Sequence, residues 1–238
     1  MGVPRVARAG TAFVLFDGAA FEDVPQAWFG ESYWRERGLL VDTVPGRGLV
    51  LFVRRGEEAW VLRHFRRGGF VAALSEDRYL WTGLERTRAF REWRLLRELF
   101  GRGLPVSRPI AARVVRTGLS YRADLITARI ENARSWASLI SAGEAQAADW
   151  HRVGVTLRRF HDEGVDHPDL NAHNILVDDR REVFVVDFDR GRLRGDGRWK
   201  QRNLKRLLRS LRKIALQTGA VFDAAGWRGL LAGYASRR

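Results

Sequence analysis

The chain has 238 residues, 45% of them hydrophobic and 29% charged, which predicts a folded globular protein of one large domain or two small lobes. It contains no cysteine, which excludes disulfide bonds, thiolate metal sites and cysteine nucleophiles. The 42 lysines and arginines outnumber the 28 acidic residues and leave a net charge of +14. Only Lys200, Lys205 and Lys213 are lysines, so almost all of the cations are arginines.

The arginine excess has two candidate explanations. Arginine binds phosphate and carboxylate through a planar, two-pronged guanidinium, so the excess is typical of proteins with a polyanionic partner, such as a phosphorylated glycolipid, an anionic membrane surface or nucleic acid. A GC-rich coding sequence would also favour arginine over lysine everywhere. No apolar run approaches the roughly 20 residues of a membrane-spanning helix and no secretion signal is recognisable, so a cytoplasmic protein is expected.

Short apolar runs separated by turn residues characterise the first half of the chain. Residues 49–53 and 59–65 flank the polar turn 54–58, which predicts a β-hairpin. Gly46 and Gly48 lie just before it. Their backbone amides could approach a phosphate, although an ordinary turn has the same composition.

Residues 88–102 predict an amphipathic helix, because large apolar side chains recur at three- and four-residue intervals. The members of this stripe are Phe90, Trp93, Leu96, Leu99 and Phe100. Strands are expected at 111–116 and 120–128, and helices at 135–140 and 147–163. Strands in the first half of the chain and helices in the second predict an α+β protein.

Residues 167–176 read His-Pro-Asp-Leu-Asn-Ala-His-Asn-Ile-Leu, and Asp187 follows Asn174 by 13 positions. The apolar runs 175–177 and 183–186, with a polar turn between them, predict a hairpin. A hairpin brings its ends together, so Asn174 and Asp187 are expected to direct oxygens into the same space, where Mg²⁺ prefers oxygen ligands. The alternative is that each side chain only caps a turn.

Residues 199–217 predict a basic amphipathic helix. Its cationic side either faces solvent on a lobe helix or contacts an anionic membrane or lipid headgroup. His161 lies shortly before the loop, and His167 and His173 lie within it; structural roles are expected for all three rather than a zinc site.

The loop and the Asp187-Phe188-Asp189 triplet resemble the catalytic core of protein-kinase-like enzymes. The resemblance implies a bilobal fold. Its N-terminal lobe, residues 1–128, would contain an antiparallel sheet and one main helix, and its C-terminal lobe, residues 129–238, would be reduced and mainly α. It implies that ATP and Mg²⁺ are the cofactors. Asp169 would then accept the proton of the attacking hydroxyl, Asn171 would position Asp169, and Asn174 and Asp187 would bind Mg²⁺.

The same resemblance assigns the nucleotide phosphates to the first lobe. Gly46 and Gly48 would approach them, and Arg63 would grip them from the strand, because no lysine precedes residue 200. A helix carboxylate orients such a cation; Glu92 is the preferred partner and Glu98 the alternative. The competing interpretation is that Arg63 is a solvated strand residue.

Four blocks narrow the resemblance to one family. They are the loop itself, Val-Asp-Phe-Asp-Arg-Gly-Arg after it, Leu-Arg-His-Phe-Arg-Arg-Gly-Gly at residues 62–69, and Gly-Arg-Gly at residues 46–48. Over residues 46–194 the chain resembles 3-deoxy-D-manno-octulosonic acid (Kdo) kinases. The resemblance implies ATP-dependent phosphorylation of the 4-hydroxyl of Kdo on a Kdo-lipid A precursor, in lipopolysaccharide inner-core biosynthesis. It also implies a peripheral protein at the cytoplasmic face of the inner membrane.

Some arginines near the expected site are then candidates for binding the Kdo carboxylate or lipid A phosphates. They are Arg66, Arg67, Arg190 and Arg192, and ordinary surface charge is the alternative for each.

Other activities remain open at this stage. A protein substrate is disfavoured, because only 51 residues follow Asp187 and no Ala-Pro-Glu motif is present. Kinases for a lipopolysaccharide heptose or an aminoglycoside are alternatives, although the latter would be expected to show an acidic acceptor site. A non-catalytic pseudokinase binding module is a third, but it would have no need for Asp169, Asn174 and Asp187 together. No nucleic-acid partner is expected, and the oligomeric state is left open.

Overall fold

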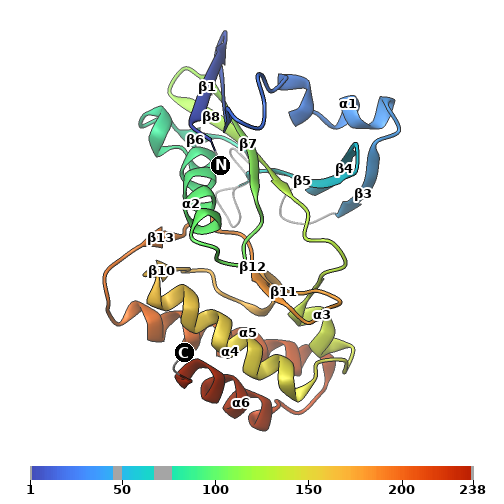
Figure 1. The fold of residues 1–238 in the computed structure, drawn as a ribbon, viewed down its shortest axis with the longest axis vertical. Coiled ribbons are helices and arrows are strands. Elements are labelled where there is room, and N and C mark those ends of the chain that lie inside the picture. Colours follow the sequence, from blue (N-terminus) through green and yellow to red (C-terminus); the bar gives the residue numbers. More distant parts are fainter. Residues whose placement is uncertain (1, 45–49, 67–76, 237–238) are drawn as a thin grey trace. The chain divides into compact units, whose positions relative to one another are not determined.

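The protein consists of two compact units. The computed structural model describes residues 2–44, 50–66 and 77–236. The first unit comprises Met1–Gly101 and Ser107–Arg129, and the second comprises Arg102–Val106 and Ile130–Arg238. Strands dominate the first unit and helices the second, so the fold is α+β, as predicted (Figure 1).

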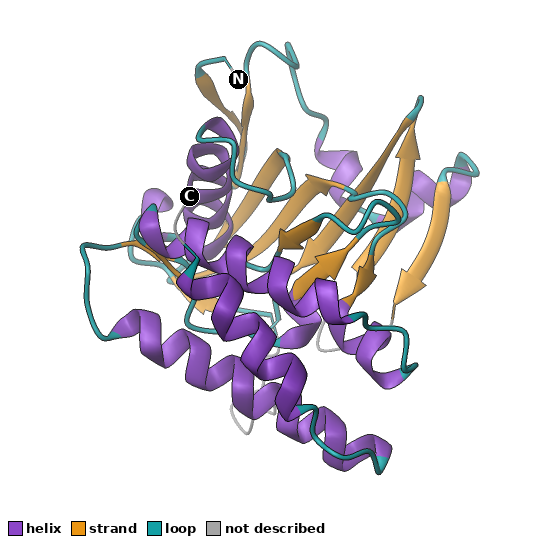
Figure 2. Cartoon of the chain, turned by 60° about the horizontal axis from the view of Figure 1, so that its bottom comes forward, coloured by secondary structure: helices purple, strands orange, loops and turns teal. Residues whose placement is uncertain are grey.

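An antiparallel eight-stranded sheet forms the body of the first unit, shown in orange in Figure 2. Its strand order is β1-β2-β7-β8-β5-β4-β3, and β6 pairs with β8 beside this path. The strands are β1 (Pro4–Ala9), β2 (Ala12–Asp17), β3 (Leu40–Val44), β4 (Val50–Arg55), β5 (Glu58–His64), β6 (Tyr79–Leu80), β7 (Pro109–Thr117) and β8 (Ser120–Ala128).

The predicted hairpin in the first half of the chain is confirmed as β4 and β5. Arg55 pairs with Glu58 at the turn, where Gly56 has a φ of +61°, a conformation that glycine adopts without strain. Along β5, Trp60 and Leu62 are buried on one face of the sheet. Arg63 points to the opposite face, because successive strand residues alternate.

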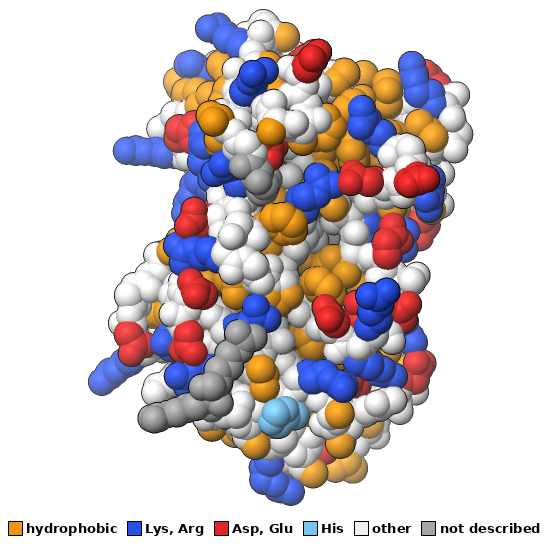
Figure 3. All heavy atoms as spheres, in the orientation of Figure 1, with side chains coloured by type: hydrophobic (Ala, Val, Ile, Leu, Met, Phe, Trp, Pro, Cys, Tyr) orange, Lys and Arg blue, Asp and Glu red, His pale blue; other side chains and the backbone are white. Residues whose placement is uncertain are grey.

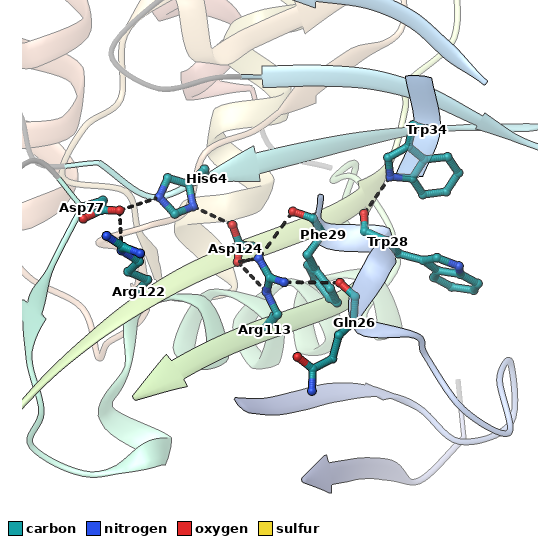
Figure 4. Close-up of polar contacts among 9 residues, drawn as sticks. All are labelled: Gln26, Trp28, Phe29, Trp34, His64, Asp77, Arg113, Arg122 and Asp124. Carbon is teal, nitrogen blue, oxygen red and sulfur yellow. Dashed lines mark hydrogen bonds and ion pairs between the residues drawn. The ribbon is translucent and has the colours of Figure 1, made fainter. Parts of the chain in front are cut away.

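Two short helices between β2 and β3 cover the face of the sheet that Trp60 and Leu62 line. After β1 and β2 the chain forms a short 3₁₀ helix, η1 (Gln26–Phe29), and helix α1 (Glu31–Glu36). Trp28 and Trp34 are buried against Trp60, with ring centroids 5.4 and 6.1 Å from it. Trp34 Nε1 donates to Trp28 O at 2.7 Å and so joins α1 to η1 (Figure 4). The apolar face of the sheet is thereby removed from water.

Helix α2 (Arg88–Gly101) packs on the other face, after a short 3₁₀ turn η3 (Leu84–Arg86). Phe90, Trp93, Leu96 and Leu99 are buried, as the apolar stripe predicted. Phe100 is 38% exposed and was wrongly included in the stripe. It lies in the last turn of the helix, next to buried Leu99 but on a more exposed side.

Helices dominate the regular structure of the second unit. They are α3 (Trp136–Ser141), α4 (Ala147–Asp162), α5 (Trp199–Thr218) and α6 (Ala224–Ala235). Helices α3, α4 and α5 confirm the helices expected at 135–140, 147–163 and 199–217, whereas α6 was not predicted. Small strands complete the unit: β9 (Arg134–Ser135), β10 (Val165–Asp166), β11 (Ile175–Val177), β12 (Val183–Val185) and β13 (Arg192–Leu193).

Helices α4 and α6 lie against each other almost backbone to backbone (Figure 1). A Cβ added at Gly154 would lie 2.0 Å from Leu230 O, and one added at Gly233 would lie 2.1 Å from His151 O. Only glycine allows this approach. No helix in the described part of the chain has the length and apolar character needed to cross a bilayer.

Candidate active site

The predicted hairpin after the His-Pro-Asp loop is present and brings Asn174 and Asp187 to the same end. Strands β11 and β12 are antiparallel, with Ile175 opposite Val185. Val186 N donates to Asn174 O at 3.0 Å across the open end, and Asp187 follows directly. Two residues 13 positions apart in sequence therefore lie at neighbouring backbone positions.

Two asparagine amides hold the loop around the backbone carbonyl of Asp169. Asn171 Nδ2 donates to this oxygen at 2.8 Å and Asn174 Nδ2 donates to it at 3.1 Å. Asn171 Oδ1 also accepts from His173 N at 2.9 Å and caps the 3₁₀ helix η4 (Ala172–Asn174). Asn171, which was expected to position Asp169, thus contacts its main-chain carbonyl.

Asp187 is held in an unusual backbone conformation. Its φ is +64°, in the left-handed region that few residues other than glycine adopt, and such conformations cluster at functional sites. The next residue, Phe188, is buried and packs on Phe160 and His167, with ring centroids 5.9 and 4.8 Å away. Burial of Phe188 anchors the main chain that carries Asp187.

His167, the first residue of the loop, has the structural role expected for it. Its Nε2 lies 3.0 Å from Val186 O, so the neutral ring donates to the hairpin. Burial lowers the pKa of His167 below its ordinary value. Asn203 of α5, with its amide turned to satisfy both groups, donates to His167 O at 3.1 Å and accepts from His167 N at 3.0 Å. Helix α5 is therefore part of the scaffold of the loop.

The carboxylate of Asp169 forms an ion pair with Arg206 of α5, from Nη2 to Oδ1. The basic character of this helix was predicted, but Arg206 was not singled out among its cations. The sequence does show that Asn203, Arg206 and Ser210, at spacings of three and four, share one side of the helix.

Asn174 and Asp187 fit a magnesium site chemically. They offer an amide and a carboxylate oxygen, and Mg²⁺ is commonly held by one or two such ligands together with substrate phosphates and water. The Asn174 nitrogen is used by Asp169 O, while no hydrogen bond within the described residues engages its Oδ1. Those residues contain no cluster of three or more acidic or histidine side chains suited to a metal, so nucleotide phosphates would have to supply further ligands.

In the first unit, the structure brings Arg63 and Glu92 together. Arg63 Nη2 contacts Glu92 Oε2, and the guanidinium lies 4.7 Å from the centre of the Phe65 ring. Glu92 is buried on α2, whereas the alternative partner Glu98 is exposed. The buried carboxylate therefore fixes the direction in which the Arg63 guanidinium points.

A second polar network, which the sequence did not reveal, lies on the opposite face of β5 (Figure 4). His64 Nδ1 is 2.6 Å from Asp124 Oδ1, and Arg113 Nε donates to Asp124 Oδ2 at 2.8 Å. Arg113 also donates to Gln26 O and Phe29 O, which fastens η1 to the sheet. The hydrogen bond to buried Asp124 raises the pKa of His64. The network holds β5 in place directly beside Arg63.

The remaining candidates are the arginines proposed for the acceptor and the two glycines proposed for the phosphates. Arg66 and Arg190 are exposed. Arg192 Nε lies 3.2 Å from the buried carboxylate of Asp166 and so neutralises it together with Arg194 at 3.1 Å. Gly46, Gly48 and Arg67 lie outside the described residues.

Many arginines beyond the site are paired with acidic residues. Examples are Arg94 with Glu85, Arg108 with Glu58, Arg134 with Glu144 and Arg158 with Asp162. On the face shown in Figure 3, blue cationic side chains are scattered among red acidic ones. Part of the arginine excess is thus used in local ion pairs.

Comparison with known proteins agrees with these features. The chain matches the model of the "Lipopolysaccharide kinase (Kdo/WaaP) family" over residues 31–234. A 3-deoxy-D-manno-octulosonic acid kinase of Xanthomonas oryzae pv. oryzae is 47% identical over 206 residues, which are 86% of this chain and 82% of the relative. Enzymes of the same name from Vibrio parahaemolyticus and Photobacterium profundum are each 40% identical, over 88% and 93% of this chain and 88% and 94% of the relatives. The chain therefore belongs to the lipopolysaccharide kinase (Kdo/WaaP) family.

Proposed function

We propose that this protein transfers the γ-phosphoryl group of ATP to the 4-hydroxyl of Kdo on a Kdo-lipid A precursor, a step of lipopolysaccharide inner-core biosynthesis. The observation that carries the proposal is the grouping of Asp169, Asn174 and Asp187 on one loop and hairpin. The family supplies the acceptor, because its curated relatives are named for Kdo and span most of the chain.

The residues of the loop account for the chemical step. Asp169 accepts the proton of the sugar hydroxyl while the hydroxyl oxygen forms a bond to the γ-phosphorus. The bond from the γ-phosphorus to the oxygen that bridges it to the β-phosphate breaks, and ADP leaves. Asn171 and Asn174 keep the main chain of Asp169 in place during the reaction.

Different residues have roles in binding the phosphates and the Mg²⁺ of the nucleotide. Residues 1–128 act as the nucleotide-binding lobe, in which Arg63, oriented by Glu92, binds phosphate oxygens, and Gly46 and Gly48 provide backbone amides. Residues 129–238 act as the catalytic lobe, in which Asn174 and Asp187 would hold Mg²⁺. When bound, Mg²⁺ supplies positive charge that offsets the charge developing on the phosphates.

Exposed cations are the candidates for binding the acceptor and the membrane. Arg66, Arg67, Arg190 and Arg192 are candidates for binding the anionic groups of the acceptor, although Arg192 also forms an ion pair with Asp166. Peripheral attachment to the cytoplasmic face of the inner membrane is supported by the exposed cations of α5 and by Leu216 near its end, which is 84% exposed.

One assay tests the activity. The purified protein is incubated with Mg-ATP and a Kdo-containing lipid A precursor, and the product is examined for the mass of one added phosphoryl group. We expect Asp169→Asn to abolish this product, because an amide cannot accept the proton. Asp179→Asn makes the same chemical change at the exposed turn of the hairpin and should retain activity.

Two outcomes would contradict the proposal. Full turnover by Asp169→Asn would show that Asp169 is not the base. Phosphorylation of a heptosylated acceptor but not of the Kdo precursor would assign the protein to another sugar.

A further inference from the structure

Helix α5 contacts the catalytic loop through residues spaced along one side. Asn203 binds the main chain of His167, and Ser210 Oγ accepts from Ala172 N at 3.2 Å. Arg206 lies between them, three residues after Asn203 and four before Ser210, and reaches the carboxylate of Asp169. The helix is therefore held at both ends of the contact, and Arg206 is presented to Asp169 from a rigid support.

The ion pair between Arg206 and Asp169 is open to solvent. The Arg206 side chain is 45% exposed and that of Asp169 is 44% exposed. Exposed pairs contribute little to stability, so this one is not needed for folding. Arg206 uses only Nη2 in the contact, and no other hydrogen bond from it occurs in the part of the chain that the structure describes. A guanidinium has five N–H donors, so Arg206 can bind a second anion while it touches Asp169.

Other cations continue along the same side of the helix. Arg202, Arg209 and Lys213 lie four residues before, three after and seven after Arg206, which places them in one stripe. All three are exposed, and within the described residues none of them forms an ion pair. This contrasts with Arg158 and Arg181 of the same unit, which pair with carboxylates. The stripe creates a positive potential that attracts an anionic acceptor toward Asp169.

We propose that Arg206 is a specificity-determining residue that binds a carboxylate carried by the acceptor sugar and thereby delivers the 4-hydroxyl of that sugar to Asp169. The inference rests on the proposed function and names the contact that selects an acidic sugar. Because one guanidinium touches both anions, the carboxylate it binds belongs to the sugar that reacts. Phosphates farther along the acceptor would meet Arg202, Arg209 and Lys213 instead.

The test compares two acceptors with two proteins. One acceptor is the Kdo-lipid A precursor, and the other is the same molecule with the Kdo carboxylate converted to a carboxamide. For the wild-type protein we expect kcat/KM to be roughly 10- to 100-fold higher for the carboxylate, as for the loss of a charged hydrogen bond. Arg206→Ala should lose about this factor on the carboxylate and show no preference between the two acceptors.

Matched variants separate the effects of the charge of Arg206, of its guanidinium geometry and of folding. Arg206→Lys keeps the charge but not the planar fork, so it should recover only part of the preference. Arg228→Ala removes an exposed arginine of α6 and should leave both rates unchanged. Thermal unfolding and ATP binding of each variant show whether the fold and the nucleotide site are retained.

Each remaining outcome counts against the inference. Equal losses on both acceptors in Arg206→Ala would assign Arg206 a merely structural role. A wild-type protein that phosphorylates both acceptors equally well would overturn the inference while leaving the proposed function intact. A wild-type protein that phosphorylates neither would overturn both, and the wild-type comparison needs no variant that might unfold.

Discussion

Two ion pairs, one in each unit, are built in opposite ways. In the first unit, Glu92 is 2% exposed and Arg63 is 24% exposed, so packing fixes both side chains. In the second unit, Asp169 and Arg206 are both nearly half exposed, and the asparagine side chains that donate to Asp169 O fix only its main chain. A pair held by burial suits a group that must keep one position, whereas an exposed pair can admit a ligand.

The largest expected effect comes from breaking the buried pair. Glu92→Ala leaves the partly buried charge of Arg63 without this carboxylate, so the free energy of unfolding should fall by about 3 kcal/mol. The KM for ATP should rise as well, because Arg63 is no longer oriented. Urea unfolding and steady-state kinetics measure the two effects. Glu85→Ala breaks the exposed pair with Arg94 and should cost less than about 1 kcal/mol; equal losses would show that burial of the Arg63–Glu92 pair adds no stability.

A second prediction concerns the left-handed backbone conformation of Asp187 in the second unit. Asn tolerates a positive φ better than Ala, so Asp187→Ala should be about 1 kcal/mol less stable than Asp187→Asn. Both variants should lose phosphoryl transfer, because neither keeps the carboxylate. Thermal unfolding compares the stabilities and the mass assay compares the activities. An equally stable pair of variants would mean that the conformation of Asp187 stores no strain.

One histidine in each unit, His64 and His161, should make the stability depend on pH in opposite directions. The pKa of His64 is raised by Asp124, so its contribution to stability is complete below its unfolded pKa of about 6.5 and is lost as pH rises through the folded pKa. Burial lowers the pKa of His161 to about 4, so its contribution is complete above pH 6.5 and is lost as pH falls toward 4.

Urea unfolding at several pH values checks both signs. His64→Gln should flatten the loss of stability on the alkaline side, and His161→Gln should flatten part of the loss on the acid side. His173 is exposed, so His173→Gln serves as the control and should change neither limb. The same profile in His64→Gln as in the wild-type protein would show that the pair with Asp124 is not ionic in solution.

The smallest expected effect on stability is that of Arg206→Ala. Because its pair with Asp169 is exposed and screened by water, the free energy of unfolding should change by no more than about 0.5 kcal/mol. Chemical denaturation measures this value alongside Glu92→Ala. A loss as large as that of Glu92→Ala would show that the second pair is also part of the folded framework.

Several parts of the fold and the site could be predicted because they depend on neighbours in sequence. The hairpin of β11 and β12 follows from two β-branched runs around a polar turn, and it determines that Asn174 and Asp187 come together. The apolar period of α2 placed Glu92 beside the buried stripe, and the absence of lysine before residue 200 left arginine as the strand cation. Local pattern is sufficient in these cases, since pleat and helical period set the directions of side chains.

The tertiary structure alone decided which distant groups meet. Arg206 lies 37 positions from Asp169, and its helix carries many cations that composition does not distinguish; packing of α5 on the loop selected one of them. His64, Asp124 and Arg113 come from three strands whose pairing no local pattern specifies, and the cover formed by η1 and α1 depends on a face completed by β5. Sequence periodicity gives the direction of each side chain relative to its own helix or strand, whereas contacts between elements depend on how all of them pack at once.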